Sequence, residues 1–199
     1  LGCQEILGPE KVLMESGLFS EIHIYDYSKN LIEKQRELTK NLGIKGIEFH
    51  TVDLNDHEFE SNQFDLVFGW GTVHHISNLD HLYSQIKKSL KPNGLFVMRE
   101  YAEPNRIQLT KKQMDIVNSL LAVIPKKYRI SPDGKLIKCQ KISKEKYVIA
   151  TDPSESIRSE DVIPRLLHHF KNAEVKLTGG TILQPLLANI AGNFEADDE

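Results

Sequence analysis

The sequence predicts an α/β fold in which a doubly wound, mostly parallel sheet carries helices on both faces and an inserted helical lid. Short apolar runs alternate with amphipathic stretches over the first 100 residues, which is typical of parallel sheets. The alternation breaks over residues 102–150 and then resumes. We therefore expect a core at 1–101, a lid or substrate-binding insertion at 102–150, and the C-terminal part of the core with an acidic tail at 151–199.

Hydrophobic periodicity, turn residues and helix caps predict where the strands and helices lie. Strands are expected at 21–25, 47–52, 64–68, 95–98 and 173–177, with a turn at 91–94. Helices are expected at 9–17, 28–42, 79–90, 110–124 and 159–170. Ser28 and Ser159 are the expected N-caps of two of these helices.

Composition excludes several classes of protein. With 199 residues, 40% of them hydrophobic and 27% charged, the chain fits one globular domain or one domain plus a small cap. No apolar run approaches the roughly 18 residues that span a bilayer, and there is no secretory leader pattern. Cys3 and Cys139 cannot build a disulfide framework, and no Cys/His spacing typical of metal ligands occurs. We expect a cytoplasmic protein without a metal.

The first residue, Leu1, lies directly inside an apolar-Gly pattern. We expect the first strand of the sheet upstream of it. The acidic tail shows no final strand, so we expect the chain to be truncated at both ends.

Charge is unevenly distributed. The net charge is −3, which argues against a protein that coats nucleic acid. Residues 101–150 carry eleven basic and four acidic side chains, a net charge of +7, whereas the rest of the chain carries −10. One interpretation is a solvated surface, and the other is a surface that attracts an anionic substrate. Arg106, near the start of this segment, is our candidate for binding an oxyanion.

Polar or flexible residues follow each expected core strand. Gly2 and Cys3 form a strand-to-helix loop, and a glycine there lets the backbone approach a ligand. Asp26 ends one strand and Asp53 the next; each is either a ligand for a nucleoside or a helix cap. The stretch 69–75, Gly-Trp-Gly-Thr-Val-His-His, follows another strand and offers a base of near-neutral pKa.

The order of these motifs, from Leu-Gly-Cys through IYDYS, TVDLND and FDLVFGWGTVHHI to LKPNGLFVMREY, resembles the class I S-adenosylmethionine-dependent methyltransferases. The resemblance covers residues 1–101 and implies a Rossmann-like fold with S-adenosylmethionine as the cofactor. It implies that Gly2, Cys3 and Gln4 hold the methionine part of the cofactor. That family has a glycine where Gln4 stands, so the loop departs from the usual pattern.

The resemblance also implies roles at the other strand ends. Asp26, with Tyr27 beside it, would bind the ribose hydroxyls. Asp53 would accept the adenine amino group while Leu54 packs against the ring, and Gly69 and Trp70 would flank the cofactor.

The acceptor is not specified by the sequence. The Asn-Pro-Pro-Tyr and Asp-Pro-Pro-Tyr motifs of amino-group methylation are absent, so we expect an oxygen of a small molecule or glycan. The base would be His75 or His74, with Glu100 and Tyr101 as neighbours, although a packed or capping histidine is an equal alternative. A non-catalytic binding module and a nicotinamide oxidoreductase remain the competing classes.

Overall fold

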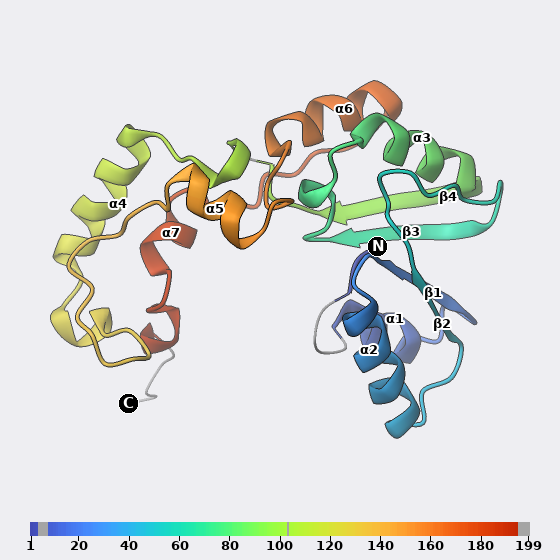
Figure 1. Cartoon of the computed structure of the whole chain (residues 1–199), viewed down its shortest axis with the longest axis horizontal. Coiled ribbons are helices and arrows are strands. Elements are labelled where there is room, and N and C mark those ends of the chain that lie inside the picture. Colours follow the sequence, from blue (N-terminus) through green and yellow to red (C-terminus); the bar gives the residue numbers. More distant parts are fainter. Residues whose placement is uncertain (4–7, 103, 195–199) are drawn as a thin grey trace. The chain divides into compact units, whose positions relative to one another are not determined.

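The computed structural model describes residues 1–3, 8–102 and 104–194, which form two compact units (Figure 1). The first unit contains Leu1–Ala102 and Ser154–Ala173. The second contains Glu103–Pro153 and Glu174–Glu199. The division after Ala102 lies beside the expected end of the core. The C-terminal part is shared, because residues 154–173 return to the first unit while those from 174 onward join the second.

The first unit contains two pairs of parallel strands. One pair joins β1 (Ile22–Asp26) to β2 (Ile47–Thr51), and the other joins β3 (Phe64–Trp70) to β4 (Leu90–Arg99). A helix makes each crossover: α2 (Lys29–Asn41) in the first pair and α3 (Leu79–Ser89) in the second. Parallel strands need such long connections, so the expected α/β class is confirmed.

The two crossover helices form where their sequences predict them. Ser28 caps α2 by accepting a hydrogen bond from the Leu31 amide at 3.3 Å, and Ile32 on its apolar face is 1% exposed. In α3, Leu82 and Ile86 are fully buried. Burial of an aliphatic side chain of this kind contributes about 1.5–3 kcal/mol, so packing rather than helix propensity fixes α3.

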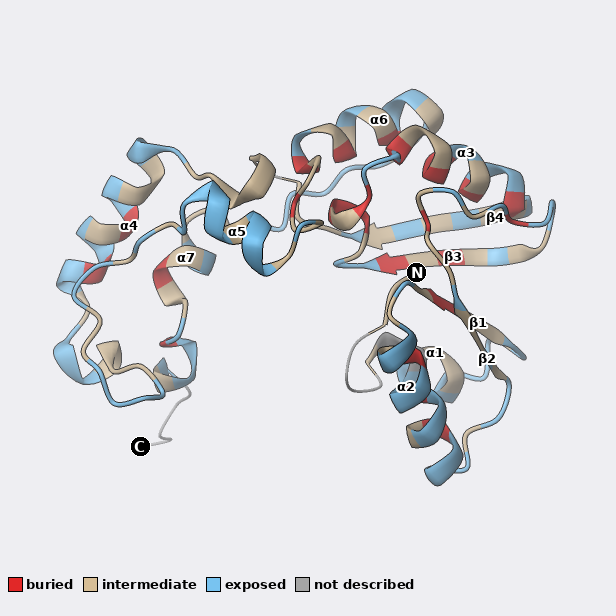
Figure 2. Ribbon diagram, viewed as in Figure 1, coloured by how far each residue is buried: buried red, intermediate tan, exposed pale blue. Residues whose placement is uncertain are grey.

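The main core of the first unit lies around α3, as the buried positions in Figure 2 show. The helix α6 (Val162–His169) packs on α3 and places Val162 in this core. The Tyr83 hydroxyl, itself buried, donates to the Val162 carbonyl at 3.0 Å. Residues 154–173 thereby become part of the first unit. A further short helix, α1 (Pro9–Glu15), precedes β1.

Leu1 and Gly2 join the two strand pairs. The Leu1 nitrogen donates to the Phe68 carbonyl in β3, and the Gly2 amide donates to the Tyr25 carbonyl in β1 at 2.8 Å. A mostly apolar cavity of about 120 Å³ adjoins them between β1 and β3. The strand expected upstream of Leu1 stays a prediction.

Two local predictions need correction. Residues 91–94, expected as a turn, lie within β4 as an irregularity: Leu90 pairs with Phe64 and regular pairing resumes at Leu95. Asn93 takes the left-handed φ of 67° that the extra residues require. Ser159 does not cap a helix but begins the 3-10 turn Ser159–Asp161 that precedes α6.

The strand expected at 173–177 is also wrong. These residues are all described and form no strand, and Leu177 is 88% exposed. Their alternating pattern suits a strand, but no neighbouring strand pairs with them.

The second unit is helical. It contains α4 (Lys111–Val123), α5 (Glu145–Thr151) and α7 (Leu183–Leu187) together with the short 3-10 helices Asn105–Ile107, Lys126–Arg129 and Ala191–Phe194. Thr110 and Gln113 form a capping box at the start of α4. Val117 and Leu121 of α4 pack against Leu186 and Ile190 in a separate small core. In the described parts of the chain, every helix is too short or too polar to cross a bilayer.

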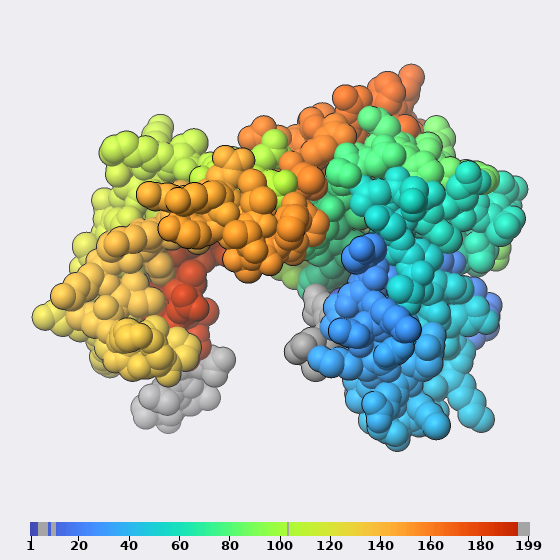
Figure 3. All heavy atoms as spheres, viewed as in Figure 1, coloured from blue at the N-terminus to red at the C-terminus, as the bar shows by residue number. Residues whose placement is uncertain are grey.

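Several basic side chains of residues 101–150 have partners inside the second unit, whose surface this segment (yellow-green to orange) largely covers in Figure 3. Lys111 pairs with Asp115 at 2.6 Å, and Lys135 with Asp133 at 2.5 Å. Lys127 lies 4.6 Å from the centre of the neighbouring Tyr128 ring. Exposed pairs of this kind contribute little, about 0–1 kcal/mol, so the surplus positive charge remains at the surface.

Candidate functional site

The loop at the start of the chain meets the end of β3 at Gly2. Gly2 has a left-handed φ of 74°, and a side chain at this position would collide with the Thr72 hydroxyl. That hydroxyl donates to the Leu1 carbonyl at 3.0 Å. Glycine is therefore required here both by its backbone conformation and by the close approach of Thr72. Gln4 lies outside the described residues.

Asp26 sits at the carboxyl end of β1 and binds two backbone amides. Its Oδ2 accepts from the Cys3 amide at 2.8 Å, and its Oδ1 accepts from the Ser28 amide at 2.7 Å. The contact with Ser28 is local and orients the backbone of the residue that caps α2, and the contact with Cys3 ties the loop to the strand end. Tyr27 beside it is 78% exposed. Ser28, and not Asp26, is the N-cap of α2, so the helix-cap alternative for Asp26 is wrong, and its role as a ligand for the ribose stays a prediction.

Asp53 follows the end of β2 and orients Asn55. Its Oδ1 accepts from the Asn55 amide at 2.9 Å and from the Asn55 side chain at 2.8 Å. Asn55 in turn accepts from the Ser77 and Asn78 amides, which precede α3. The adjacent Leu54 is 5% exposed and belongs to the main core. The loop after β2 is thus fixed to the start of α3.

The stretch 69–75 turns sharply at the end of β3. Gly69 lies close to β4, where a side chain would meet the Met98 Cβ at 3.7 Å. Trp70 is 40% exposed, with the Arg99 guanidinium 4.9 Å from the centre of its ring. Gly71 has a left-handed φ of 60°, and the 3-10 helix Val73–His75 follows.

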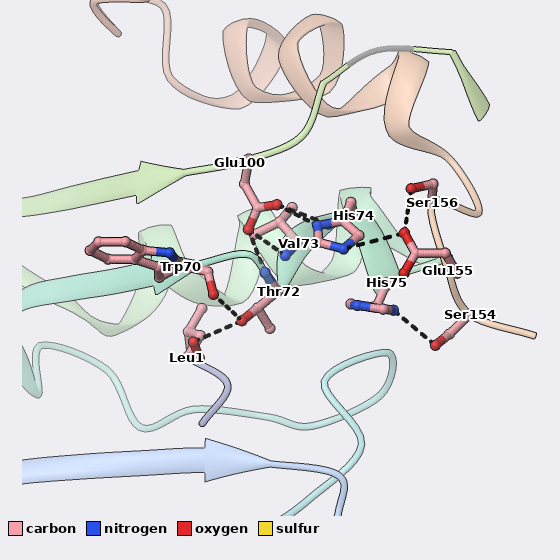
Figure 4. A network of polar contacts seen from close by, with 10 residues as sticks. All are labelled: Leu1, Trp70, Thr72, Val73, His74, His75, Glu100, Ser154, Glu155 and Ser156. Carbon is pink, nitrogen blue, oxygen red and sulfur yellow. Dashed lines mark hydrogen bonds and ion pairs between the residues drawn. The ribbon is translucent and has the colours of Figure 1, made fainter. Parts of the chain in front are cut away.

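Glu100, directly after β4, holds this turn (Figure 4). Its Oε1 accepts from the Thr72 and Val73 amides at 2.6 and 2.7 Å, and its Oε2 accepts from the His74 Nδ1 at 2.8 Å. The Glu100 side chain is 3% exposed. Burial alone would raise the pKa of Glu100, but the hydrogen bonds from His74, Val73 and Thr72 outweigh it and hold the pKa below its usual value.

The ionised Glu100 fixes the tautomer of His74. A carboxylate only accepts hydrogen bonds, so the His74 Nδ1 carries a proton. The His74 Nε2 faces Glu155 at 3.7 Å. With a carboxylate beside each ring nitrogen and only 9% exposure, His74 is a buried link between the end of β4 and the segment that begins at Ser154.

His75 lies beside His74, with 4.2 Å between the ring centres, and is partly exposed. Its Nδ1 lies 3.0 Å from the Ser154 hydroxyl. Glu155 accepts a hydrogen bond from the Ser156 hydroxyl at 2.6 Å. Tyr101 presents its ring edge to His74, with the ring centres 6.4 Å apart.

The structure thus brings His74, His75, Glu100 and Tyr101 together. It adds Ser154, Glu155 and Ser156, which the sequence analysis did not identify, and Thr72, which lies within the 69–75 motif but was assigned no role. No pattern in the sequence links residues 154–156 to a motif about 80 positions earlier.

Arg106 belongs to the second unit. Its Nη1 donates to the Pro153 carbonyl at 2.7 Å, and its φ is 58°. The oxyanion-binding role predicted for it stays a prediction.

Two groups in the described chain have the residue types and spacing of metal ligands. They are His23, Glu48 and His50 on β1 and β2, and His74, His75 and Glu155 at the end of β3. In each group the ligand atoms lie within 4.8 Å of one another. The second group has competing hydrogen bonds, because Glu100 and Ser154 already contact its two imidazoles.

The comparisons with known proteins identify a methyltransferase family. A family model described as a methyltransferase domain matches residues 11–150. Phosphoethanolamine N-methyltransferase 2 of Caenorhabditis elegans is 29% identical over 96 residues, which are 48% of this chain and 22% of that protein. Sterol methyltransferase-like 2 of Botryococcus braunii is 29% identical over 104 residues, which are 50% and 26% of the two chains.

Solved structures share the fold. The cyclase SpnF has a TM-score of 0.51 and 13% identity over 94% of this chain and 58% of its own. A protein from Bacillus halodurans C-125 described as a methyltransferase has a TM-score of 0.50 and 14% identity, with 81% and 58% covered. At these identities the likeness concerns the fold alone.

The family match and the fold together define a class I, S-adenosylmethionine-dependent methyltransferase domain, and the cofactor of that class is S-adenosylmethionine. The chain belongs to the methyltransferase domain family that matches residues 11–150, which confirms the resemblance seen in the sequence. It spans about a quarter or less of the length of the curated relatives it matches.

Proposed function

We propose that this chain carries out S-adenosylmethionine-dependent methyl transfer to an oxygen of a small-molecule or glycan acceptor in the cytoplasm. The observation that carries the proposal is the junction of Gly2, Asp26 and Thr72 at the carboxyl ends of β1 and β3. Ligands of doubly wound sheets bind at this edge. The family match supports the cofactor, and a chain with two cysteines, too few for a disulfide framework, is typical of a reducing compartment.

The residues at this edge fit the cofactor. A carboxylate such as Asp26 accepts hydrogen bonds from neighbouring ribose hydroxyls, and its present partners are backbone amides that leave further lone pairs on each oxygen. All the hydrogen bonds given by the described residues to the Asp53 side chain go to Oδ1. We assign Oδ2 of Asp53 to the adenine amino group. When bound, S-adenosylmethionine supplies the methyl group from a sulfonium.

His75 is the proposed base. It is the more exposed of the two histidines, and its Nδ1 lies 3.0 Å from the Ser154 hydroxyl, which orients the ring. The imidazole of His75 takes the proton from the acceptor hydroxyl. His74 and Glu100 are positioning residues, because their polar atoms contact one another and the backbone of 72–74. They hold the turn that carries His75.

Two observations bear on the class of acceptor: the names of the relatives and the charge of residues 101–150. The two relatives described above are named for phosphoethanolamine and for sterols, which are small molecules of opposite polarity. The positive charge of residues 101–150 favours an acceptor that carries phosphate or carboxylate.

Calorimetry and mass spectrometry test the activity. The purified chain should bind S-adenosylmethionine and S-adenosylhomocysteine and not NAD. With methyl-deuterated cofactor and a panel of hydroxylated, phosphorylated and amine acceptors, the label should appear in a hydroxylated product. Cofactor binding without transfer to any acceptor would favour a non-catalytic module, and binding of NAD alone would indicate an oxidoreductase.

The proposed base has its own test. His75→Gln should lower kcat by about 10²–10⁴-fold while the dissociation constant of the cofactor stays within about twofold. His168→Gln, which alters an exposed histidine of α6, is the matched control. Full activity of His75→Gln would show that this histidine only packs against Ser154.

A further inference from the structure

We propose that His23, Glu48 and His50 form a binding site for a divalent transition-metal ion of the zinc type. The three side chains lie on the β1–β2 pair and are distinct from the residues assigned to the cofactor and the base. The site is defined by the geometry of these side chains and does not depend on methyl transfer.

The parallel register places the three residues on one face of the strand pair. His23 lies opposite Glu48 and Tyr25 lies opposite His50. Alternate residues of a strand share a face, so His23 and Tyr25 point the same way, as do Glu48 and His50. Ile24, between the two on β1, is 3% exposed, and α2 packs against both strands. A sequence search for closely spaced ligands misses this group because β1 and β2 are joined by a long crossover.

The distances suit a single ion. The His23 Nδ1 lies 3.0 Å from the His50 Nε2 and 3.6 Å from the Glu48 Oε2, and the last two atoms are 3.8 Å apart. The point equidistant from the three atoms, in their plane, lies about 2.0 Å from each, which is the length of a zinc–nitrogen or zinc–oxygen bond. An ion at or just outside this plane therefore contacts all three with small adjustments of the side chains.

The surroundings hold the imidazoles in place. The Tyr25 ring stacks on His50 with 4.4 Å between the centres and 12° between the planes. Phe64 presents an edge to His23, with the ring centres 5.6 Å apart. The Glu21 carboxylate lies 3.5 Å from the His23 Nε2, the nitrogen opposite the one that faces the ion. Carboxylates in that position orient metal-binding histidines and increase their basicity.

The donor set identifies the ion. Two imidazole nitrogens and one carboxylate oxygen suit Zn²⁺, whereas Mg²⁺ and Ca²⁺ prefer oxygen ligands alone. Glu48 is 57% exposed, so water can complete a tetrahedral site. The proton of the hydrogen bond between the His23 Nδ1 and the His50 Nε2 is released to solvent when both nitrogens bind the ion. The ion would link β1 to β2 three residues before Asp26.

Calorimetric titration of the whole chain with Zn²⁺, and the visible spectrum of the Co²⁺-substituted protein, test the site. We expect one Zn²⁺ per chain at this site, a Co²⁺ spectrum typical of four ligands, and no comparable binding of Mg²⁺. His50→Ala and Glu48→Gln should each weaken Zn²⁺ binding at least tenfold. His168→Ala is the matched control and should leave it unchanged.

A further variant separates the two histidine groups. His75→Ala should keep the Zn²⁺ affinity if the site is on β1 and β2. Loss of binding in His75→Ala but not in His50→Ala would overturn the proposal, as would the absence of Zn²⁺ binding in the wild-type chain. Far-UV circular dichroism shows whether His50→Ala is folded. If it is not, His50→Gln, which preserves the side-chain volume better, replaces it in the titration.

Discussion

Glu100 and Asp26 are carboxylates at the ends of parallel strands, yet their surroundings differ. Glu100 is 3% exposed and accepts hydrogen bonds from two amides and an imidazole at 2.8 Å or less. Asp26 is partly exposed and accepts from two amides, one of them only two residues away. Position at a strand end therefore does not decide what a carboxylate does. The burial of the carboxylate and the number of hydrogen-bond donors around it decide whether it stabilises the fold or stays available to a ligand.

This difference in burial indicates separate roles for Glu100, after β4, and Asp26, at the end of β1. A buried carboxylate with several donors stabilises the turn around it, and loss of its charge leaves those donors unsatisfied. A partly exposed carboxylate keeps lone pairs for a ligand at small cost in folding free energy. We expect mutations near β4 to affect stability first, and mutations near β1 and β2 to affect cofactor binding first.

Removal of Glu100 should have the largest effect. Glu100→Ala leaves the Thr72 and Val73 amides and the His74 imidazole without their buried acceptor, so the free energy of unfolding should fall by about 3–5 kcal/mol. Denaturant unfolding measures this change. Glu60→Ala, at an exposed glutamate, should change it by less than about 0.5 kcal/mol. A loss as small as that of the control would contradict the structural role.

Glu100 should also determine how the free energy of unfolding changes at acid pH. Its pKa is lowered in the folded protein, so the stabilisation is complete above its unfolded-state pKa and is lost as pH falls through the lower folded-state value. The free energy of unfolding should therefore decline below about pH 4.5. Glu100→Gln should make this decline smaller. If the free energy of unfolding of the variant falls as steeply between pH 5 and 3 as that of the wild type, other groups cause the decline.

Asp26 should control cofactor binding rather than folding. Asp26→Asn removes the charge that would strengthen two hydrogen bonds to the ribose, so the dissociation constant of S-adenosylmethionine should rise at least tenfold. The free energy of unfolding should fall by only about 1 kcal/mol, because the bonds to Cys3 and Ser28 are partly exposed. Asp56→Asn, at an exposed aspartate after β2, is the control. Equal cofactor affinity in both variants would limit Asp26 to its bonds with the Cys3 and Ser28 amides.

Asp53 should have a smaller effect on the same dissociation constant. The adenine amino group offers one neutral donor, which is worth about 0.5–1.5 kcal/mol, or up to about tenfold in affinity. Asp53→Ala also releases Asn55, so its unfolding is measured in parallel. If Asp53→Ala weakens binding more than Asp26→Asn does, the two roles are reversed.

Local signals predicted local structure well. Ser28 caps α2 and Thr110 begins α4 because capping depends on residues three positions apart. The strand expected at 173–177 and the cap at Ser159 were wrong, since a strand needs a partner and a cap needs an unobstructed side chain. Ser159 is fully buried, and its hydroxyl has no hydrogen-bond partner within the described chain.

Long-range contacts account for what the sequence could not predict about the site. The strand-end motifs identified His74 and its neighbour Glu100, but the second partner of His74, Glu155, lies 81 positions away and carries no such motif. Periodicity carries no information across such intervals. The same holds for His23 and His50, which meet only because β1 and β2 pair in one register.

The smallest effect is expected at Arg106, outside the first unit. Residues 101–150 carry a net charge of +7 against −10 elsewhere, and an anionic acceptor would be attracted to them. The Arg106 Nη1 binds the Pro153 carbonyl, which fixes the guanidinium, and a planar guanidinium can hold an oxyanion in two-point geometry. With whichever acceptor the deuterium-label screen returns, Arg106→Ala should raise KM about three- to tenfold at low ionic strength, and Arg106→Lys less. The difference should shrink as salt screens the charge, over a Debye length of about 3 Å at 1 M. A KM that is independent of both salt and the substitution would mean that Arg106 serves only to hold Pro153 and that the acceptor is neutral.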